Sequence, residues 1–153
     1  MNKEKYMSLA LKEANKAYQE DEVPIGCVIV LNDEVIAKAH NRKIKKDDPT
    51  AHAEIECIKK ACKKLNSKYL VDAEMYVTLE PCIMCSGAII QSRIKKVYIG
   101  TLDPKGGAFG SCVDVTSIKK LNHYPKVEIG IKQEECSSIL KEFFKNKRNK
   151  LPR

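Results

Sequence analysis

The sequence has no long apolar run, no signal peptide and no internal repeat. Its apolar stretches fall well short of the ~20 residues that a membrane-spanning helix requires. Met1–Lys5 leads directly into a helical pattern, without the apolar core of a secretory signal. Linkers and low-complexity segments are also missing. We therefore expect one domain over residues 1–153, located in the cytoplasm and without a membrane partner.

Cysteine is present, but not in the arrangement of a disulfide-stabilised protein. The seven cysteines are an odd number. Reduced thiols in a cytosolic protein are the simpler interpretation. Small buried side chains are expected at the five positions that are scattered without regular spacing, namely Cys27, Cys57, Cys62, Cys112 and Cys136.

Acidic residues are outnumbered by basic ones, which permits a polyanionic partner. The 28 Lys and Arg against 20 Asp and Glu give a net charge of +8. A lysine-rich composition is the alternative explanation, because most of these basic residues are Lys. Clustering favours a binding role, since Lys and Arg supply salt-dependent affinity for phosphate. The two clusters are Arg42, Lys43, Lys45 and Lys46, and then Lys141, Lys145, Lys147, Arg148, Lys150 and Arg153.

Two short motifs carry the chemistry, His52-Ala53-Glu54 and Pro81-Cys82-Ile83-Met84-Cys85. One imidazole and two thiols supply three zinc ligands, and a catalytic zinc site keeps its fourth position open for water. The carboxylate is then free to move protons. An H-x-E motif followed by P-C-x-x-C is the signature of zinc nucleobase deaminases. The predicted metal ligands are His52, Cys82 and Cys85, and the predicted proton donor and acceptor is Glu54.

Helix geometry constrains both motifs. Cys82 and Cys85 lie three residues apart in the first turn of an expected helix, so both thiols can reach one ion. His52 and Glu54 lie two apart and would point in different directions in mid-helix. Both can reach one pocket only if His52 is at the helix start, where the backbone is not yet helical. The helix-opening signal at residues 48–50 fits this requirement.

A closed structural zinc site is the alternative interpretation. It would need a fourth protein ligand, for which Cys57, His40, His123 or Cys62 could be offered. None of them has the spacing to a partner that zinc motifs show, so the catalytic interpretation is favoured. His40 and His123 are expected to be ordinary polar residues.

Strands and helices alternate along the chain. Helices are expected over residues 3–20, about 50–65, 81–93 and 133–147. Strands are expected over residues 26–31, 35–40, 74–79, 96–100 and 126–131, with a glycine-rich loop over 101–111. Such alternation around a buried sheet indicates one α/β domain.

Six segments resemble bacterial tRNA-specific adenosine deaminases, a family of the zinc-dependent cytidine/deoxycytidylate deaminase superfamily. The resemblance covers most of the chain and implies the cytidine deaminase-like fold, a three-layer α/β/α arrangement with a five-stranded mixed sheet between helices. It also implies one zinc ion per subunit and a homodimer. The segments are Asn41-Arg42, Asp48–Glu54, Tyr76–Cys82, Ser92–Ile94, Asp103–Ser111 and Leu121–His123.

The resemblance further implies a substrate, the wobble adenosine of a tRNA anticodon stem-loop. Zinc-activated water would attack C6 of the base, with Glu54 as proton shuttle, to give inosine. Asn41 would hold the target nucleotide, and Asp103, Asn122 and Phe144 would lie at the anticodon loop. Each of these has a structural alternative: Asn41 could end a strand, Asp103 is a natural turn residue, and Phe144 or its neighbour is expected in the core.

Two other functions remain open from the sequence alone. A small-molecule deaminase acting on guanine, cytosine or a nucleoside would need neither the basic C-terminus nor the Asp103–Ser111 loop. A non-catalytic zinc-bearing RNA-binding module would have no use for Glu54. The RNA-editing enzyme is the prediction that uses all of these features.

Overall fold

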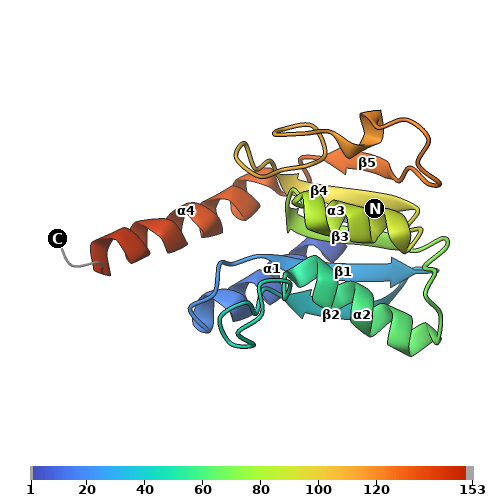
Figure 1. Cartoon of the computed structure of the whole chain (residues 1–153). Coiled ribbons are helices and arrows are strands. Elements are labelled where there is room, and N and C mark those ends of the chain that lie inside the picture. The colour runs from blue at the N-terminus through green and yellow to red at the C-terminus, as the bar shows by residue number, and fades with distance from the viewer. Residues whose placement is uncertain (1, 151–153) are drawn as a thin grey trace.

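The computed structural model describes residues 2–150, with side chains as far as Arg148. Of the C-terminal basic cluster, Arg153 and the side chain of Lys150 lie outside this description. Helices cover both faces of a central sheet (Figure 1). In chain order the elements are α1 (Lys3–Gln19), β1 (Gly26–Leu31), β2 (Glu34–His40), α2 (Ala53–Leu65), β3 (Glu74–Leu79), α3 (Ile83–Gln91), β4 (Lys96–Thr101), η1 (Val115–Ser117), β5 (Lys126–Ile129) and α4 (Gln133–Lys150).

The sheet is mixed, with the strand order β2-β1-β3-β4-β5. β1 pairs antiparallel with β2 and with β3. β3, β4 and β5 run parallel to one another. The carboxyl ends of β3 and β4 therefore meet at one edge of the sheet, which is where α/β proteins place their ligands. Pro81-Cys82 follows β3, and the glycine-rich loop (residues 102–111) follows β4.

Alternate side chains of the central strands enter two separate cores. In β1, Cys27 and Ile29 pack with α2 and α3, whereas Val28 packs with α1. Tyr76 and Tyr98 stack on the α1 side with ring centroids 4.3 Å apart. Burial on both faces explains why these strands are almost continuously apolar.

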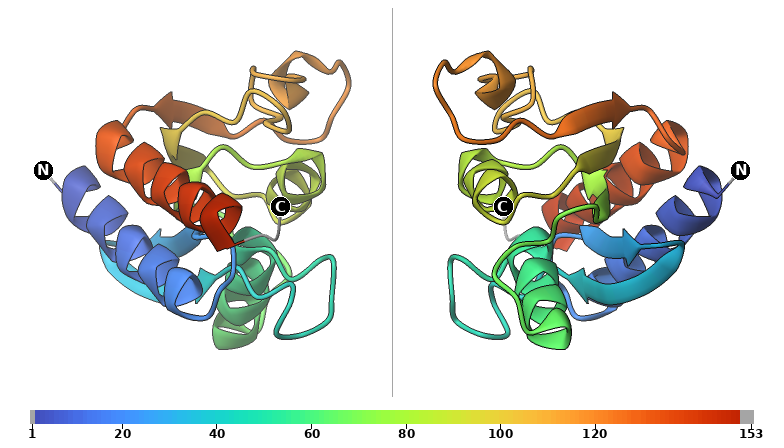
Figure 2. Two further views of the ribbon diagram at one scale, coloured as in Figure 1. Left: turned by 90° about the vertical axis from the view of Figure 1, so that its left-hand side faces the viewer. Right: turned by 90° about the vertical axis from the view of Figure 1, so that its right-hand side faces the viewer.

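The helices form two layers, with the sheet between them. Figure 2 shows α1 and α4 on one side of the sheet and α2 and α3 on the other. This is the predicted three-layer α/β/α arrangement, and the five-stranded mixed sheet is confirmed. The far end of α4 extends beyond the sheet (Figure 1). None of the described helices combines the length and apolar character needed to cross a membrane.

Element boundaries differ from the sequence prediction mainly at helix starts. α2 begins at Ala53 rather than near residue 50, because Asp48 accepts hydrogen bonds from the amide and hydroxyl of Thr50 at 2.8 and 2.7 Å and closes a turn there. α3 begins at Ile83 instead of Pro81. The short helix η1 was not predicted, and α4 runs three residues beyond the expected end.

Candidate metal centre and active site

His52 and Cys82 occupy equivalent positions, each immediately before the first turn of a helix. Their backbones are extended, with ψ 153° at His52 and ψ 176° at Cys82. Neither side chain caps its own helix. Residues two apart within a helix point in different directions. His52 precedes the helical backbone, so this constraint does not apply to the side chains of His52 and Glu54. The predicted position of His52 at a helix start is confirmed.

The three predicted ligands converge on one point. His52 Nδ1 lies 3.6 Å from Cys82 Sγ and 3.4 Å from Cys85 Sγ, and all three ligand atoms lie within 4.8 Å of one another. A tetrahedral zinc ion with Zn–S and Zn–N bonds of about 2.3 and 2.0 Å would hold sulfur and nitrogen about 3.5 Å apart. The donor set and its spacing therefore fit zinc.

No fourth His, Cys, Asp or Glu joins this group among the side chains that the structure describes. Three of the four candidates for a closed site are engaged elsewhere: Cys57 Sγ contacts the carbonyl of Cys27, and both histidines have other partners. His40 contacts Glu13 and Glu20, and the ring of His123 contacts the carbonyl of Ile94 at 2.6 Å. Three ligands with one position left over are typical of a catalytic zinc site.

The two thiols differ in their acidity. Hydrogen bonding from Cys85, and then from His52, lowers the pKa of Cys82 to about 3, although burial opposes the shift. The same contact with Cys82, together with burial, raises the pKa of Cys85 far above its ordinary value. On their own, the two cysteines therefore favour ionisation of Cys82 only. A divalent cation between them would favour ionisation of both thiols, which is what a zinc ligand requires.

Glu54 lies in the first turn of α2 and is 4% exposed. Burial raises its pKa to about 7, an effect that the nearby His52 partly offsets. A carboxyl group with such a pKa can both accept and release a proton near neutral pH. It is not a member of the ligand group, as expected for a proton shuttle.

A cavity of about 910 Å³ opens beside His52. Its rim is formed by the basic loop (residues 41–50), the glycine-rich loop and one face of α4. Apolar side chains provide much of its wall, namely Val23, Ile25, Leu79, Leu102, Leu140 and Phe144. Five cations also line it, namely Lys43, Lys105, Lys141, Lys147 and Arg148. One residue of the basic-loop cluster, Lys43, thus meets three of the α4 cluster at one cavity.

Three of the four predicted RNA-contacting residues line this cavity: Asn41, Asp103 and Phe144. Asn41 is 3% exposed, and its buried Oδ1 has no hydrogen-bond partner. A buried unpaired acceptor at a cavity is a natural partner for a ligand donor. The fourth residue, Asn122, is exposed on the loop between η1 and β5 and is not part of the cavity lining.

The two neighbouring phenylalanines of α4 have separate roles. Phe143 is 5% exposed and packs edge-on against Tyr18 of α1. Phe144 is 45% exposed and lines the cavity. One is therefore a core residue, as predicted, and the other offers an open aromatic face, on which an unstacked base can pack.

Sequence reasoning missed two buried carboxylates beside the cavity, Glu22 and Glu80, which are 1% and 2% exposed. Each accepts backbone hydrogen bonds from one rim loop. The available signal was a charged residue directly adjoining an apolar segment, at Glu22-Val23 and at Leu79-Glu80.

The fold and the His-Cys-Cys centre define a nucleobase deaminase of the H-x-E and P-C-x-x-C class. The profile of the MafB19-like deaminase family matches residues 1–148. The tRNA-specific adenosine deaminase of Aquifex aeolicus (strain VF5) is 49% identical over 151 residues, 99% of each chain. That of Bacillus subtilis (strain 168) is 46% identical and spans 96% of this chain and 91% of its own. The chain belongs to the tRNA-specific adenosine deaminase family.

Among solved structures, too, the chain is more similar to a tRNA adenosine deaminase than to a deaminase of a free base. One from a study of A-to-I editing by tRNA:A34 deaminases at the wobble position of transfer RNA has a TM-score of 0.87 and 48% identity, covering 89% of this chain and 99% of that one. A guanine deaminase from Bacillus subtilis has a TM-score of 0.65 and 28% identity, covering 100% and 98%. Both share the fold, and the editing enzyme is the more similar in sequence.

Proposed function

We propose that this protein converts the wobble adenosine of a tRNA anticodon to inosine by hydrolytic deamination. The observation that carries the proposal is the cavity itself, whose lining includes His52 of the three-ligand metal centre and five cations. The metal centre supports hydrolysis of an exocyclic amine, and the cations support a substrate that carries phosphates.

His52, Cys82 and Cys85 would hold one zinc ion per chain. When bound, zinc lowers the pKa of a coordinated water toward ~7 and so provides hydroxide near neutral pH. Glu54 would transfer protons between the water and the base. Its buried carboxylate accepts one proton of the attacking water and passes it to the ring nitrogen, where it stays, and then transfers the second proton, from the hydroxyl group added at C6, to the amine that departs as ammonia. Water is thereby added at C6 of adenine, and the amino group leaves.

The remaining cavity residues would orient the nucleotide. Asn41 offers its unpaired buried Oδ1 to a donor of the substrate. Apolar walls formed by Val23 and Ile25 would exclude water around the base. Phe144 would stack on a neighbouring base of the anticodon loop. Asp103, at the start of the glycine-rich loop, would contact the anticodon loop. Asn122 lies outside the cavity lining and would contact the RNA away from the cavity.

A small-molecule deaminase is the second candidate, favoured by the likeness to a guanine deaminase. A free base has no phosphates, so Lys43, Lys105, Lys141 and Arg148 of the rim would have no role in binding it. The cations of the rim therefore favour the RNA substrate.

We also propose that the protein acts as a homodimer, as the family resemblance implies. In such a dimer the partner would cover Ile83, which follows the ligand Cys82 directly and is 64% exposed. Light scattering coupled to gel filtration tests this, and a mass of 17.3 kDa in solution would contradict it.

The decisive assay compares substrates. An anticodon stem-loop with adenosine at the wobble position should be converted to the inosine form, whereas adenosine, adenine, guanine and cytosine should react far more slowly. The same stem-loop with guanosine at the wobble position is the control for base choice. Efficient deamination of a free base with the stem-loop inert would assign the protein to the small-molecule class.

A further inference from the structure

Two irregular loops form opposite parts of the cavity rim. The basic loop follows β2 and carries Asn41 and Lys43 to the cavity, and the glycine-rich loop follows β4 and carries Asp103 and Lys105. Neither loop belongs to the sheet or to a helix, and backbone hydrogen bonds, such as that from the Arg42 amide to the Ala51 carbonyl, hold each loop in part. In both loops a buried carboxylate adds further hydrogen bonds.

Glu80 fixes the glycine-rich loop. Its Oε1 accepts hydrogen bonds from the Asp103 amide at 3.0 Å and the Ser111 hydroxyl at 2.5 Å. Its Oε2 accepts from the amides of Phe109 at 2.9 Å and Ser111 at 3.2 Å. Both ends of the loop therefore converge on one side chain, two residues before the ligand Cys82.

The packing between Glu80 and this loop leaves no spare room. A Cβ atom on Gly107 would lie 2.2 Å from Cδ of Glu80, so only glycine allows the loop backbone to approach the carboxylate this closely. The amide of Ala108 also donates to the carbonyl of Pro81 at 2.9 Å. The loop thus rests directly on the segment that leads to the metal centre.

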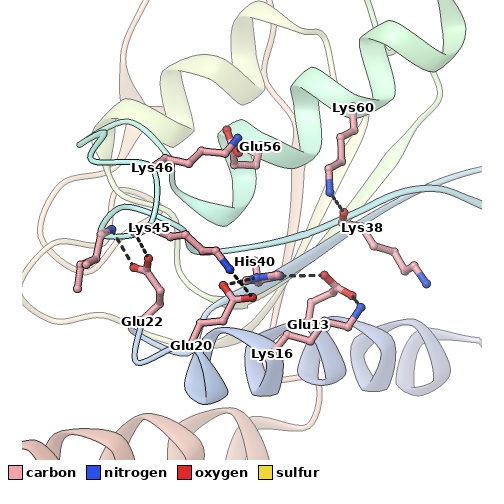
Figure 3. Close-up of polar contacts among 11 residues, drawn as sticks. Glu13, Lys16, Glu20, Glu22, Lys38, His40, Lys45, Lys46, Glu56 and Lys60 are labelled. Carbon is pink, nitrogen blue, oxygen red and sulfur yellow. Dashed lines mark hydrogen bonds and ion pairs between the residues drawn. The ribbon is translucent and has the colours of Figure 1, made fainter.

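Glu22 performs the same task for the basic loop. Its Oε1 accepts from the amide of Ile44 at 3.2 Å and its Oε2 from the amide of Lys45 at 2.8 Å. Figure 3 shows the carboxylate of Glu22 turned toward this loop. These amides directly follow Lys43 in the chain, so their position determines where Lys43 meets the cavity.

Both carboxylates are used in an unusual way. Within the part of the chain that the structure describes, neither forms an ion pair, and N–H or O–H donors of the loops surround them instead. A carboxylate is an acceptor at both oxygens, whereas a glutamine would turn an NH₂ group toward one of these donors. The arrangement therefore requires the acidic side chain and not only its size.

We propose that Glu22 and Glu80 are positioning residues for the RNA substrate, Glu22 acting through Lys43 and Glu80 acting through Asp103. The proposal rests on the proposed function, because it assigns to both loops a contact with the anticodon stem-loop. Each carboxylate affects RNA binding only through the loop that it holds, so the two carboxylates act independently of each other.

Double-mutant cycles test this statement. Binding of a wobble-adenosine stem-loop is measured as Kd in a Glu54→Gln background, so that the RNA is not converted. Glu80→Gln should weaken binding about tenfold, because it leaves buried donors of the loop without an acceptor. In that variant a further Asp103→Ala should cost little more. Glu22→Gln and Lys43→Ala should form a second coupled pair.

The crossed pairs are the matched controls. Glu80→Gln with Lys43→Ala, and Glu22→Gln with Asp103→Ala, should weaken binding by the product of the single effects. Zinc content should stay at one ion per chain in every variant. Multiplicative effects in all four cycles, or loss of zinc from Glu80→Gln, would overturn the proposal. Should Glu80→Gln fail to fold, Ser111→Ala removes one of its donors and enters the same cycle.

Hydrogen exchange separates this proposal from the proposed function. Amides of Phe109 and Ser111 should exchange faster in Glu80→Gln and not in Glu22→Gln, and the amides of Ile44 and Lys45 should show the reverse. This readout needs no RNA. A stem-loop that does not bind the unmodified protein would end the proposed function, whereas unchanged exchange at these amides would end the positioning role.

Discussion

The metal centre and the rim of the cavity are built by different means. The ligands His52 and Cys82 directly precede two helices, so regular backbone on one side of each ligand fixes its place. The rim loops have irregular backbone, and buried carboxylates fix them from residues distant in the chain. Within each motif the metal centre thus depends on short-range structure, although the two motifs lie 30 residues apart and meet only in the fold, whereas the rim depends throughout on contacts between residues distant in the chain. Changes at the centre should abolish function, and changes at the rim should reduce it by degrees.

The largest effect is expected from the metal ligands. Cys85→Ser should abolish zinc binding and activity, because two ligands cannot hold the ion. It should also destabilise the fold, since bound zinc adds about 4 kcal/mol when free zinc exceeds its Kd a thousandfold. Metal analysis and thermal unfolding with and without a chelator measure both effects. Cys112→Ser, at an exposed cysteine, is the control and should change neither. Full zinc content in Cys85→Ser would contradict the ligand assignment.

Glu54→Gln comes next, because it removes the proton shuttle and leaves the metal ligands intact. Turnover of the stem-loop should fall by at least ~10²–10⁴-fold. Zinc content and the Kd for RNA should be retained. Glu56→Gln is the matched control, since Glu56 is also buried in the first turns of α2 but pairs with Lys46. Loss of zinc from Glu54→Gln would show that Glu54 is a ligand.

The same contrast explains what could be predicted from the sequence. The spacing of His52-Ala53-Glu54 and of Cys82 and Cys85 is local, so the centre could be predicted without coordinates. The strands could be predicted because their apolar runs are short and bounded by turns. The partners of Glu22 and Glu80 lie 22 to 31 residues away, and no local pattern identifies them. The predicted start of α2, near residue 50, was also wrong. The side chain of Asp48 closes a turn there, and composition alone does not distinguish such a turn from a helix start.

A change on the rim should have a graded effect. Lys141→Ala removes one cation that lines the cavity. The Kd for the stem-loop should rise about threefold to tenfold, and the slope of log Kd against log salt should fall by ~0.7, as for one lost phosphate contact. Lys145→Ala is the control, because Lys145 is exposed on the same helix but does not line the cavity. Equal effects of the two variants would mean that only the net charge of α4 matters.

The smallest effect is expected at an ion pair below the basic loop. Glu13 lies between Lys16 and His40, which directly precedes Asn41 (Figure 3). Burial tends to raise the pKa of Glu13, but its hydrogen bonds with Lys16 and His40 outweigh this and keep the pKa below its ordinary value of 4.5. A carboxyl group with a lowered pKa stabilises the fold above its unfolded pKa, and this contribution is lost as the pH falls through the folded pKa.

Lys16→Gln should therefore lower the free energy of unfolding by about 0.5 kcal/mol at pH 7, since Lys16 is 57% exposed and solvent screens the pair. The difference from the unmodified protein should disappear well below pH 4.5, where Glu13 is protonated in both. Urea unfolding at several pH values measures it, with Lys12→Gln on the exposed face of α1 as control. Because the pair does not touch the cavity, the Kd for RNA should not change. A higher Kd for RNA in Lys16→Gln would contradict this and show that charge pairs beneath the basic loop also help to position the rim.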